Sequence, residues 1–259
     1  MKIIINGLNG YMGGEVARLC CEGYHGAKLV MGIDPADSGE WDVPVYESAD
    51  AAESVEADCI IDFSHHSAAP AILDYAKREG LPIIVATTGH TEGELEAIYS
   101  AAESIPVFFS ANMSLGVALL VELAKRTAAA MPDADIEIVE KHHTRKLDAP
   151  SGTALMLARE ICSVRPEAYI NPGRSGRGRR DENEIGIHAI RIGNVVGEHE
   201  VIVSTPSQTI TLKHEAHSRA LFAEGAIAAA EYLVGMPAGL YDMKSLVGER
   251  ATVTSDEIG

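Results

Sequence analysis

The sequence predicts an α/β protein, a doubly wound parallel sheet followed by an α+β domain with mixed or antiparallel strands. Short β-branched runs alternate with helical segments through the first 113 residues, and a glycine-rich turn joins the first run to the first helical segment. Over residues 184–217, β-branched runs alternate with turn residues and no helical segment intervenes. Near-continuous apolar strands separated by helices are typical of a parallel sheet covered on both faces, and closely spaced strands are typical of antiparallel pairing.

The elements of the first part follow from the spacing of apolar residues. Five apolar runs predict strands at residues 2–6, 28–34, 57–63, 81–88 and 105–111. Residues with helical spacing between them predict helices at 13–23, 67–80 and 91–104. Strands followed by helices in series predict parallel pairing.

The pattern changes near residue 114. A long apolar helix is expected at 114–131, a strand at 133–143, a helix at 151–162, antiparallel strands within 184–217, and an Ala-rich helix at 218–236 followed by a short tail. Ser151 stands where it can cap the middle helix, directly after Pro150. We therefore predict one domain over 1–113, to which 219–259 return, and a second over 114–218.

Composition excludes several classes of function. The formal net charge of −17 argues against nucleic acid or an acidic membrane surface as partner. No apolar run approaches the ~20 residues of a membrane span, and the N-terminus lacks the layout of a signal peptide. The four cysteines form no C-x-x-C, so we expect reduced thiols rather than zinc or disulfides. These features predict a cytoplasmic protein.

The turn "GLNGYMGG" suggests a dinucleotide site. Gly7, Gly10 and Gly13 are spaced by three, after a strand and at the start of a helix, where glycine lets a backbone approach a pyrophosphate. The spacing also fits a tight turn without a ligand. Asp34 follows the second strand, where a carboxylate can accept ribose hydroxyls in a Rossmann-type fold. "ATTG" and "SANMS" add small polar residues at two further strand ends, so we predict dinucleotide binding.

Asp34 also bears on which dinucleotide is bound. A carboxylate repels a 2′-phosphate, the next residue is Pro35 rather than Arg, and no basic residue lies within 36–50. The sequence therefore favours NADH over NADPH.

The segment "EKHHTRKLDAPSGTA" (140–154) concentrates titratable groups before a capped helix. Histidine exchanges protons near neutral pH, and Lys146 can anchor a carboxylate or donate a proton. Gly152 and Thr153 offer N–H groups at a helix start. These residues predict a site for a small anionic substrate that undergoes proton transfer; a solvated basic loop is the alternative. Metal binding is not expected, because adjacent histidine side chains diverge.

A resemblance to a known family rests on five motifs: "GLNGYMGG", "ATTG", "SANMS", "EKHHTRKLDAPSGTA" and "IGIHAIRIGNVVGEHEV". In this order, and over nearly the whole chain, they resemble the dihydrodipicolinate reductase family. The resemblance implies reduction of the cyclic dicarboxylate 4-hydroxy-tetrahydrodipicolinate (dihydrodipicolinate) by NADH or NADPH. The product, tetrahydrodipicolinate, belongs to the diaminopimelate route to lysine.

Site residues follow from the resemblance, position by position. It implies that His142 is the proton donor and acceptor, that Lys146 is a second proton donor, and that His143, Gly152 and Thr153 bind the substrate carboxylates. It implies cofactor binding by Gly7, Leu8, Asn9, Gly10, Tyr11, Met12, Asp34, Ala86, Thr87, Thr88, Ser110, Ala111, Asn112 and Met113. It also implies a homotetramer joined through strands of 114–218, and domain closure to bring the nicotinamide against the substrate ring.

Three positions depart from the family pattern. Ala86 replaces a glycine, which would be costly if the backbone there had a positive φ. Met113 replaces an aromatic residue and can still pack on a nicotinamide. His65 stands where many members carry a basic residue for a 2′-phosphate, which again weakens the case for NADPH.

Two other functions fit parts of the pattern. One is a two-domain dehydrogenase of the aspartate or homoserine type, against which the "HHTRKLDAPSGT" segment argues. The other is a dinucleotide sensor without activity, which would leave the histidines and Lys146 without a role.

Overall fold

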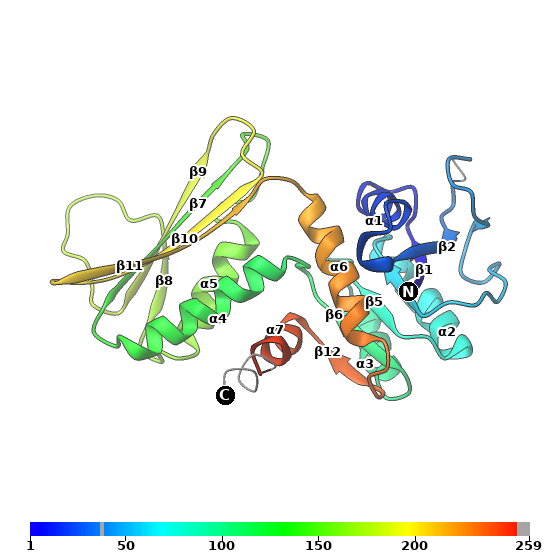
Figure 1. The fold of residues 1–259 in the computed structure, drawn as a ribbon. Helices are drawn as coiled ribbons and strands as arrows, with labels where there is room; N and C mark the ends of the chain where they lie inside the picture. Colours follow the sequence, from blue (N-terminus) through cyan, green and yellow to red (C-terminus); the bar gives the residue numbers. More distant parts are fainter. Residues whose placement is uncertain (37–38, 253–259) are drawn as a thin grey trace. The chain divides into compact units, whose positions relative to one another are not determined.

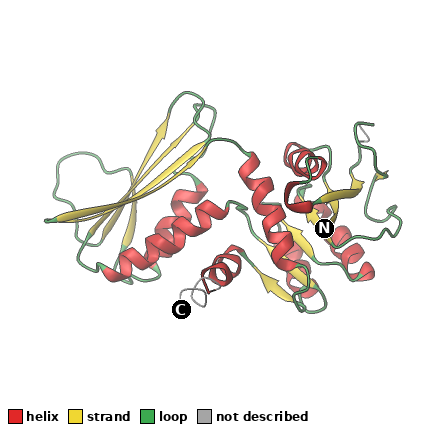
Figure 2. Ribbon diagram, viewed as in Figure 1, coloured by secondary structure: helices red, strands yellow, loops and turns green. Residues whose placement is uncertain are grey.

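The computed structural model describes residues 1–36 and 39–252 and divides into two units. Unit 1 consists of Met1–Leu115 together with the segment from Ala220 onward, and unit 2 is Gly116–Arg219. Each unit has its own sheet, and helices pack against each sheet (Figures 1 and 2).

Unit 1 contains a parallel sheet, in which the described residues form seven strands. They are β1 (Lys2–Asn6), β2 (Lys28–Ile33), β3 (Val45–Tyr46), β4 (Cys59–Asp62), β5 (Ile83–Val85), β6 (Pro106–Phe109) and β12 (Gly239–Tyr241). Their order across the sheet is β12-β6-β5-β4-β1-β2-β3, and every pair is parallel. The doubly wound order predicted from the alternating pattern is confirmed.

Helices cover both faces of this sheet. α1 (Tyr11–Cys21) packs against α6 (Ala220–Leu233), and α2 (Ala69–Glu79) packs against α3 (Glu92–Ala101) (Figure 1). Ile4 belongs to the core cluster formed with α2 and α3, whereas Ile3 and Ile5 are equally buried on the alternate face. Burial on both faces explains why these strands read as continuous apolar runs.

Unit 2 is an α+β layer whose sheet has the order β11-β10-β7-β9-β8. The elements are α4 (Leu115–Ala130), β7 (Asp135–His142), α5 (Gly152–Cys162), β8 (Tyr169–Pro172), β9 (Glu184–Arg191), β10 (Gly197–Thr205) and β11 (Gln208–Ala216). β10 is antiparallel to β7 and β11, while β9 is parallel to β7 and β8. α4 and α5 pack on the face that carries Ile136, Ile138 and Val201. The sheet is mixed, as predicted.

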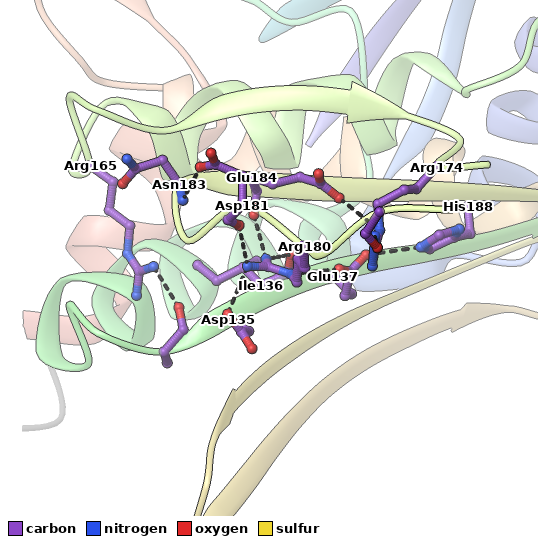
Figure 3. Close-up of polar contacts among 12 residues, drawn as sticks. Asp135, Ile136, Glu137, Arg165, Arg174, Arg180, Asp181, Asn183, Glu184 and His188 are labelled. Atoms are coloured by element: carbon purple, nitrogen blue, oxygen red, sulfur yellow. Dashed lines mark hydrogen bonds and ion pairs between the residues drawn. The ribbon is translucent and has the colours of Figure 1, made fainter. Parts of the chain in front are cut away.

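The basic segment 173–180 is held against the sheet of unit 2 by acidic residues (Figure 3). Arg180 donates to Glu137 at 3.0 Å, to Asp135 at 2.7 Å and to the backbone carbonyl of Ile136 at 3.1 Å. Arg174 pairs with Glu184 at 3.3 Å. These contacts give two of its arginines a structural role in the crossover from β8 to β9.

The C-terminal part of unit 1 differs from the predicted tail. After α6 the chain adds β12 beside β6 and then forms α7 (Met243–Thr252). β12 has three residues and α7 has little amphipathic pattern, so neither leaves a clear signal in the sequence. Within the described part of the chain, every helix is too short or too polar to span a membrane.

Candidate functional site

The first group of predicted site residues lies at the carboxyl edge of the parallel sheet. Backbone hydrogen bonds connect each turn to the last residue of a neighbouring strand: Gly7 N–H donates to the Ile33 carbonyl at 2.8 Å, and Ala86 N–H donates to the Asp62 carbonyl at 3.0 Å. Ser110 N–H donates to Val85 at 3.2 Å. The segments beginning at Gly7, Asp34, Ala86 and Ser110 therefore share the edge at which open α/β sheets bind ligands.

Gly7 and Gly13 make a close turn possible. Gly7 has a φ of +81°, and a Cβ there would lie 2.7 Å from the backbone of Ser64. A Cβ on Gly13 would lie 2.0 Å from the Gly7 carbonyl oxygen. Neither position has room for a side chain, so the start of α1 approaches the strand end as a bare backbone. This geometry suits a pyrophosphate at the helix N-terminus.

Asp34 is fixed beside a cavity of about 560 Å³. Its two carboxylate oxygens accept the backbone N–H groups of Asn9 and Ala36, each at 3.0 Å. The described residues that line this cavity include Gly7, Asp34 and His65 and no Lys or Arg. A carboxylate at an apolar cavity of this size suits the ribose and base of an adenosine moiety.

Several residues of the predicted cofactor set point their side chains into the protein. Leu8 is fully buried, and its Cδ2 occupies the space that a Cβ on Gly32 would need, at 2.1 Å. Met113 is also buried, whereas Tyr11 is largely exposed. Leu8 and Met113 are thus enclosed by the protein.

Local hydrogen bonds shape the loops after β5 and β6. Thr87 Oγ1 lies 2.9 Å from Nε2 of His90, and Ser110 Oγ donates to the Asn112 carbonyl at 2.9 Å. Among the described residues, His25 is the one non-glycine residue with a positive φ. Ala86 therefore has no positive φ, at the position where the resemblance implies a glycine.

The sequence analysis missed Asp62 at the end of β4. The Asp62 side chain is fully buried, and its Oδ1 accepts from Asn6 Nδ2 at 2.9 Å and from Ser64 Oγ at 2.6 Å. Burial raises the pKa of this carboxyl group. Through these hydrogen bonds, Asp62 connects Asn6, which directly precedes the glycine turn, with Ser64 in the turn after β4. Asp62 lies inside the apolar run 57–63, and that run alone does not indicate these contacts.

The second group lies in unit 2, where β7 presents two polar side chains on its buried face. Alternation along the strand places Ile136, Ile138, Glu140 and His142 on that face. Nδ1 of His142 lies 2.6 Å from Oε2 of Glu140. In the strand register, Arg191 of β9 pairs with His142, and His199 of β10 pairs with Glu140. Three adjacent strands therefore build one polar cluster.

The loop between β7 and α5 is electropositive. Lys146 pairs with Asp148 at 2.8 Å, and Arg145 donates to Asn194 at 2.8 Å. Desolvation, together with the positive charges of Arg145, Arg219 and Lys146, lowers the pKa of His143 below its ordinary value. In an acidic protein this local excess of positive charge suits a small anion.

Helix α5 begins next to this loop. The side chain of Ser151 accepts the N–H of Ala154 at 3.2 Å, which confirms the predicted cap. Gly152 and Thr153 form the first turn, at the positive end of the helix dipole. Oγ of Ser151 lies 3.0 Å from Nε2 of His199, and burial lowers the pKa of His199 to about 4.

The structure brings each predicted set together within its own unit. His142, His143, Lys146, Gly152 and Thr153 lie along the continuous β7–loop–α5 segment, and the predicted cofactor residues lie along the sheet edge of unit 1. Sequence reasoning missed Glu140, Arg191 and His199, although alternation along 135–142 would have placed Glu140 beside His142. In the described residues, no group of three or more His, Cys, Asp or Glu side chains is arranged to hold a metal ion.

Comparison with known proteins gives a consistent result. The family model described as "Dihydrodipicolinate reductase, N-terminus" matches residues 1–113, and "Dihydrodipicolinate reductase, C-terminus" matches residues 116–247. A 4-hydroxy-tetrahydrodipicolinate reductase of Caldanaerobacter subterraneus subsp. tengcongensis is 45% identical, over 95% of this chain and 98% of the relative. One from Clostridium novyi is 42% identical, over 95% and 98%. A dipicolinate-bound dihydrodipicolinate reductase from Paenisporosarcina sp. TG-14 superposes with a TM-score of 0.80 at 25% identity, covering 93% of this chain and 97% of that one.

Proposed function

Since the chain belongs to the dihydrodipicolinate reductase family, we propose how its residues divide the work of that family's reaction. The reaction is the reduction of 4-hydroxy-tetrahydrodipicolinate, a cyclic dicarboxylate, to tetrahydrodipicolinate by NAD(P)H, a step of lysine and diaminopimelate biosynthesis. The observation that carries the division is the buried His142–Glu140 pair at 2.6 Å, directly before an electropositive loop and a capped helix start.

Unit 2 holds the substrate in this proposal. Lys146 and His143 attract the carboxylates of the ring, and the first-turn N–H groups of Gly152 and Thr153 bind one of them. The pKa of His143 supports this role. Desolvation lowers it, and the surrounding positive charges lower it further. A neutral His143 donates one hydrogen bond without adding a further charge.

Unit 1 holds the dinucleotide. The backbone from Gly7 to Met12 receives the pyrophosphate, and Asp34 accepts the ribose hydroxyls at the 560 Å³ cavity. The loops Ala86–Thr88 and Ser110–Met113 flank the nicotinamide. The carboxylate of Asp34 and the lack of Lys or Arg among the described lining residues of the cavity support a preference for NADH over NADPH.

The 4-hydroxy ring loses water to give the conjugated C=N/C=C system of dihydrodipicolinate, and the reduction then adds one hydride and one proton across that system. When bound, the reduced nicotinamide supplies the hydride. His142 supplies the proton from its ring, and Lys146 is the second proton donor. Burial of His142 keeps bulk water from its ring, and the anchored loop fixes the donors relative to the substrate carboxylates.

Assembly and location extend the proposal. We propose a cytoplasmic homotetramer joined through strands of unit 2, as the family resemblance implies. The four cysteines are free thiols, which suits a reducing compartment.

A coupled assay tests the proposed function. Pyruvate and aspartate semialdehyde are condensed enzymatically just before use, and the oxidation of NADH and of NADPH is followed. We expect turnover with both and a higher kcat/KM with NADH. Oxidation of NADH or NADPH with aspartate semialdehyde alone would favour a homoserine-type dehydrogenase, and oxidation with oxaloacetate and ammonium would favour an aspartate-type one. NADH binding without oxidation by any of them would favour a sensor.

A further inference from the structure

The buried carboxylate of Glu140 is the common acceptor of four donors. Oε2 receives Nδ1 of His142 at 2.6 Å and Nη1 of Arg191 at 2.8 Å. Oε1 receives Nη2 of Arg191 at 2.9 Å and the N–H of Ser151 at 3.0 Å. Glu140 itself has no exposed surface. We propose that Glu140 is the positioning residue of the proton donor, which holds the His142 ring with its Nδ1 proton inward and leaves Nε2 to exchange protons with the substrate. This rests on the proposed role of His142.

The ionisation of Glu140 decides the tautomer. Burial acts to raise the pKa of this carboxyl group, but the hydrogen bonds from Arg191, His142 and Ser151 outweigh burial and hold the pKa below its ordinary value. An ionised carboxylate can only accept hydrogen bonds. Nδ1 of His142 must therefore carry a proton in both the neutral and the charged ring, and Nε2 is the nitrogen that gains or loses one.

The other neighbours of the ring are consistent with this assignment. A Cβ on Gly197 would lie 3.1 Å from Nε2, so a glycine at this position keeps that side of the ring clear. His199 packs edge-on with ring centroids 5.2 Å apart and stays neutral near pH 7, because burial lowers its pKa to about 4. Arg191 on β9 donates to the Glu140 carboxylate, and His143 and Lys146 in the following loop are further titratable groups of this region.

Glu140 also connects the proton donor to the substrate-binding helix. Oε1 accepts the N–H of Ser151, the residue that caps α5. One carboxylate therefore fixes the His142 ring and the start of the helix that presents Gly152 and Thr153. Such a link sets the distance between the proton and the bound carboxylate.

The same strand supplies a matched control. Glu137 accepts from Nε of Arg180 at 3.0 Å and from Nε2 of His188 at 2.9 Å (Figure 3). It reproduces the contact of one glutamate with one arginine and one histidine, on the opposite face of β7 and partly exposed. A general effect of removing such a charge from β7 would appear at both positions.

The Glu140→Gln variant tests the tautomer directly. The amide oxygen can keep the N–H of Ser151 and one Arg191 donor, so the amide NH₂ faces Nδ1 of His142. Nδ1 must then accept, and the proton moves to Nε2. We expect long-range ¹⁵N–¹H spectra of histidine-labelled protein, with His142→Gln to assign the signal, to show protonated Nδ1 in the parent and protonated Nε2 in Glu140→Gln. This readout requires no substrate.

Kinetics supply the second readout. We expect kcat to fall by about 100-fold or more in Glu140→Gln with a smaller change in KM, since a ring held in the wrong tautomer loses most of its catalytic effect. Glu140→Asp, which keeps the charge, should retain protonated Nδ1 and an intermediate kcat, and Glu137→Gln should resemble the parent protein.

NADH affinity distinguishes a folding defect from a specific loss of catalysis. NADH affinity, a property of unit 1, should not change in Glu140→Gln; if this variant fails to fold, the Glu140→Asp spectra and the tautomer of the parent decide. Two results would overturn the positioning role and leave the proposed function standing. One is an unprotonated Nδ1 of His142 in the parent protein; the other is a normal kcat in Glu140→Gln while His142→Gln is inactive. If His142→Gln left the reductase activity unchanged, His142 would instead not be the proton donor.

Discussion

Oε2 of Glu140 lies 2.6 Å from Nδ1 of His142, and the two residues are separated by a single position on β7. A strand repeats its direction every second residue, so the strand itself places this pair on the buried face. Arg191 and Ser151 then neutralise and fix the carboxylate. The site is therefore built into regular structure and does not depend on the loop alone.

The glycine turn can be tested with two neighbouring glycines of α1. Gly13→Ala should abolish or weaken NADH binding at least tenfold and lower the Tm, because the new Cβ would lie 2.0 Å from the Gly7 carbonyl oxygen. Gly14→Ala should bind NADH normally and gain about 0.5–1 kcal/mol, since its Cβ meets nothing closer than 3.9 Å and alanine favours a helix. Calorimetry of both variants measures the difference. Normal binding by Gly13→Ala would contradict the close approach.

Asp34 should set the preference for NADH. Asp34→Ala removes the acceptor of the ribose hydroxyls, worth about 1.5–3 kcal/mol for a charged hydrogen bond, so NADH should bind roughly 10- to 100-fold more weakly. NADPH should be affected less, because the repulsion of its 2′-phosphate is lost as well. Dissociation constants of both dinucleotides provide the measurement. Asp34→Asn isolates the charge, and an unchanged NADH/NADPH ratio in both variants would show that Asp34 does not contact the ribose.

Lys146 should matter for the substrate and not for the dinucleotide. Lys146→Met should lower kcat/KM roughly 10- to 100-fold or more, since it removes a cation from the substrate carboxylates and one proton donor. Lys141→Met is the matched control: Lys141 pairs with Glu198, which Lys213 also neutralises, and its kinetics should stay near those of the parent. Steady-state kinetics of the pair distinguish the two lysines. Equal losses in both would point to a general effect of charge.

His199 should make the stability of unit 2 depend on pH. Burial lowers its folded pKa from an ordinary 6.5 to about 4. Between these values the unfolded chain binds a proton that the folded chain does not, so stability rises with pH through this window. The contribution is complete above pH 6.5 and is lost as the pH falls towards 4, on the order of 3 kcal/mol in total.

Urea unfolding followed by circular dichroism at pH 7, 6 and 5 checks this effect. The His199→Gln variant should lose less stability than the parent protein over that range, because glutamine does not titrate. Parallel curves for the two proteins would mean that His199 is not buried as a neutral ring in solution.

Sequence patterns predicted most of the fold, because apolar periodicity and chain order determine it. Five strands of the parallel sheet and the cap at Ser151 followed from local patterns. β3, β8 and β12 could not be predicted, since they have two to four residues and lie outside the longer apolar runs that marked β4, β5 and β6, and α7 has little amphipathic pattern. The site residues predicted for each unit came from motifs. The contacts of Glu140 with Arg191 and Ser151 depend on strand register and on residues 51 and 11 positions away, which no local pattern encodes.

The central claim is that His142 delivers the proton that completes reduction of the ring, and His142→Gln tests it most directly. With freshly condensed substrate and NADH, we predict a fall in kcat of about 100- to 10,000-fold, the usual contribution of a positioned acid, with KM and NADH affinity close to those of the parent. A variant that retains the parental kcat would contradict the account, because no proton would then pass through the imidazole that Glu140 holds.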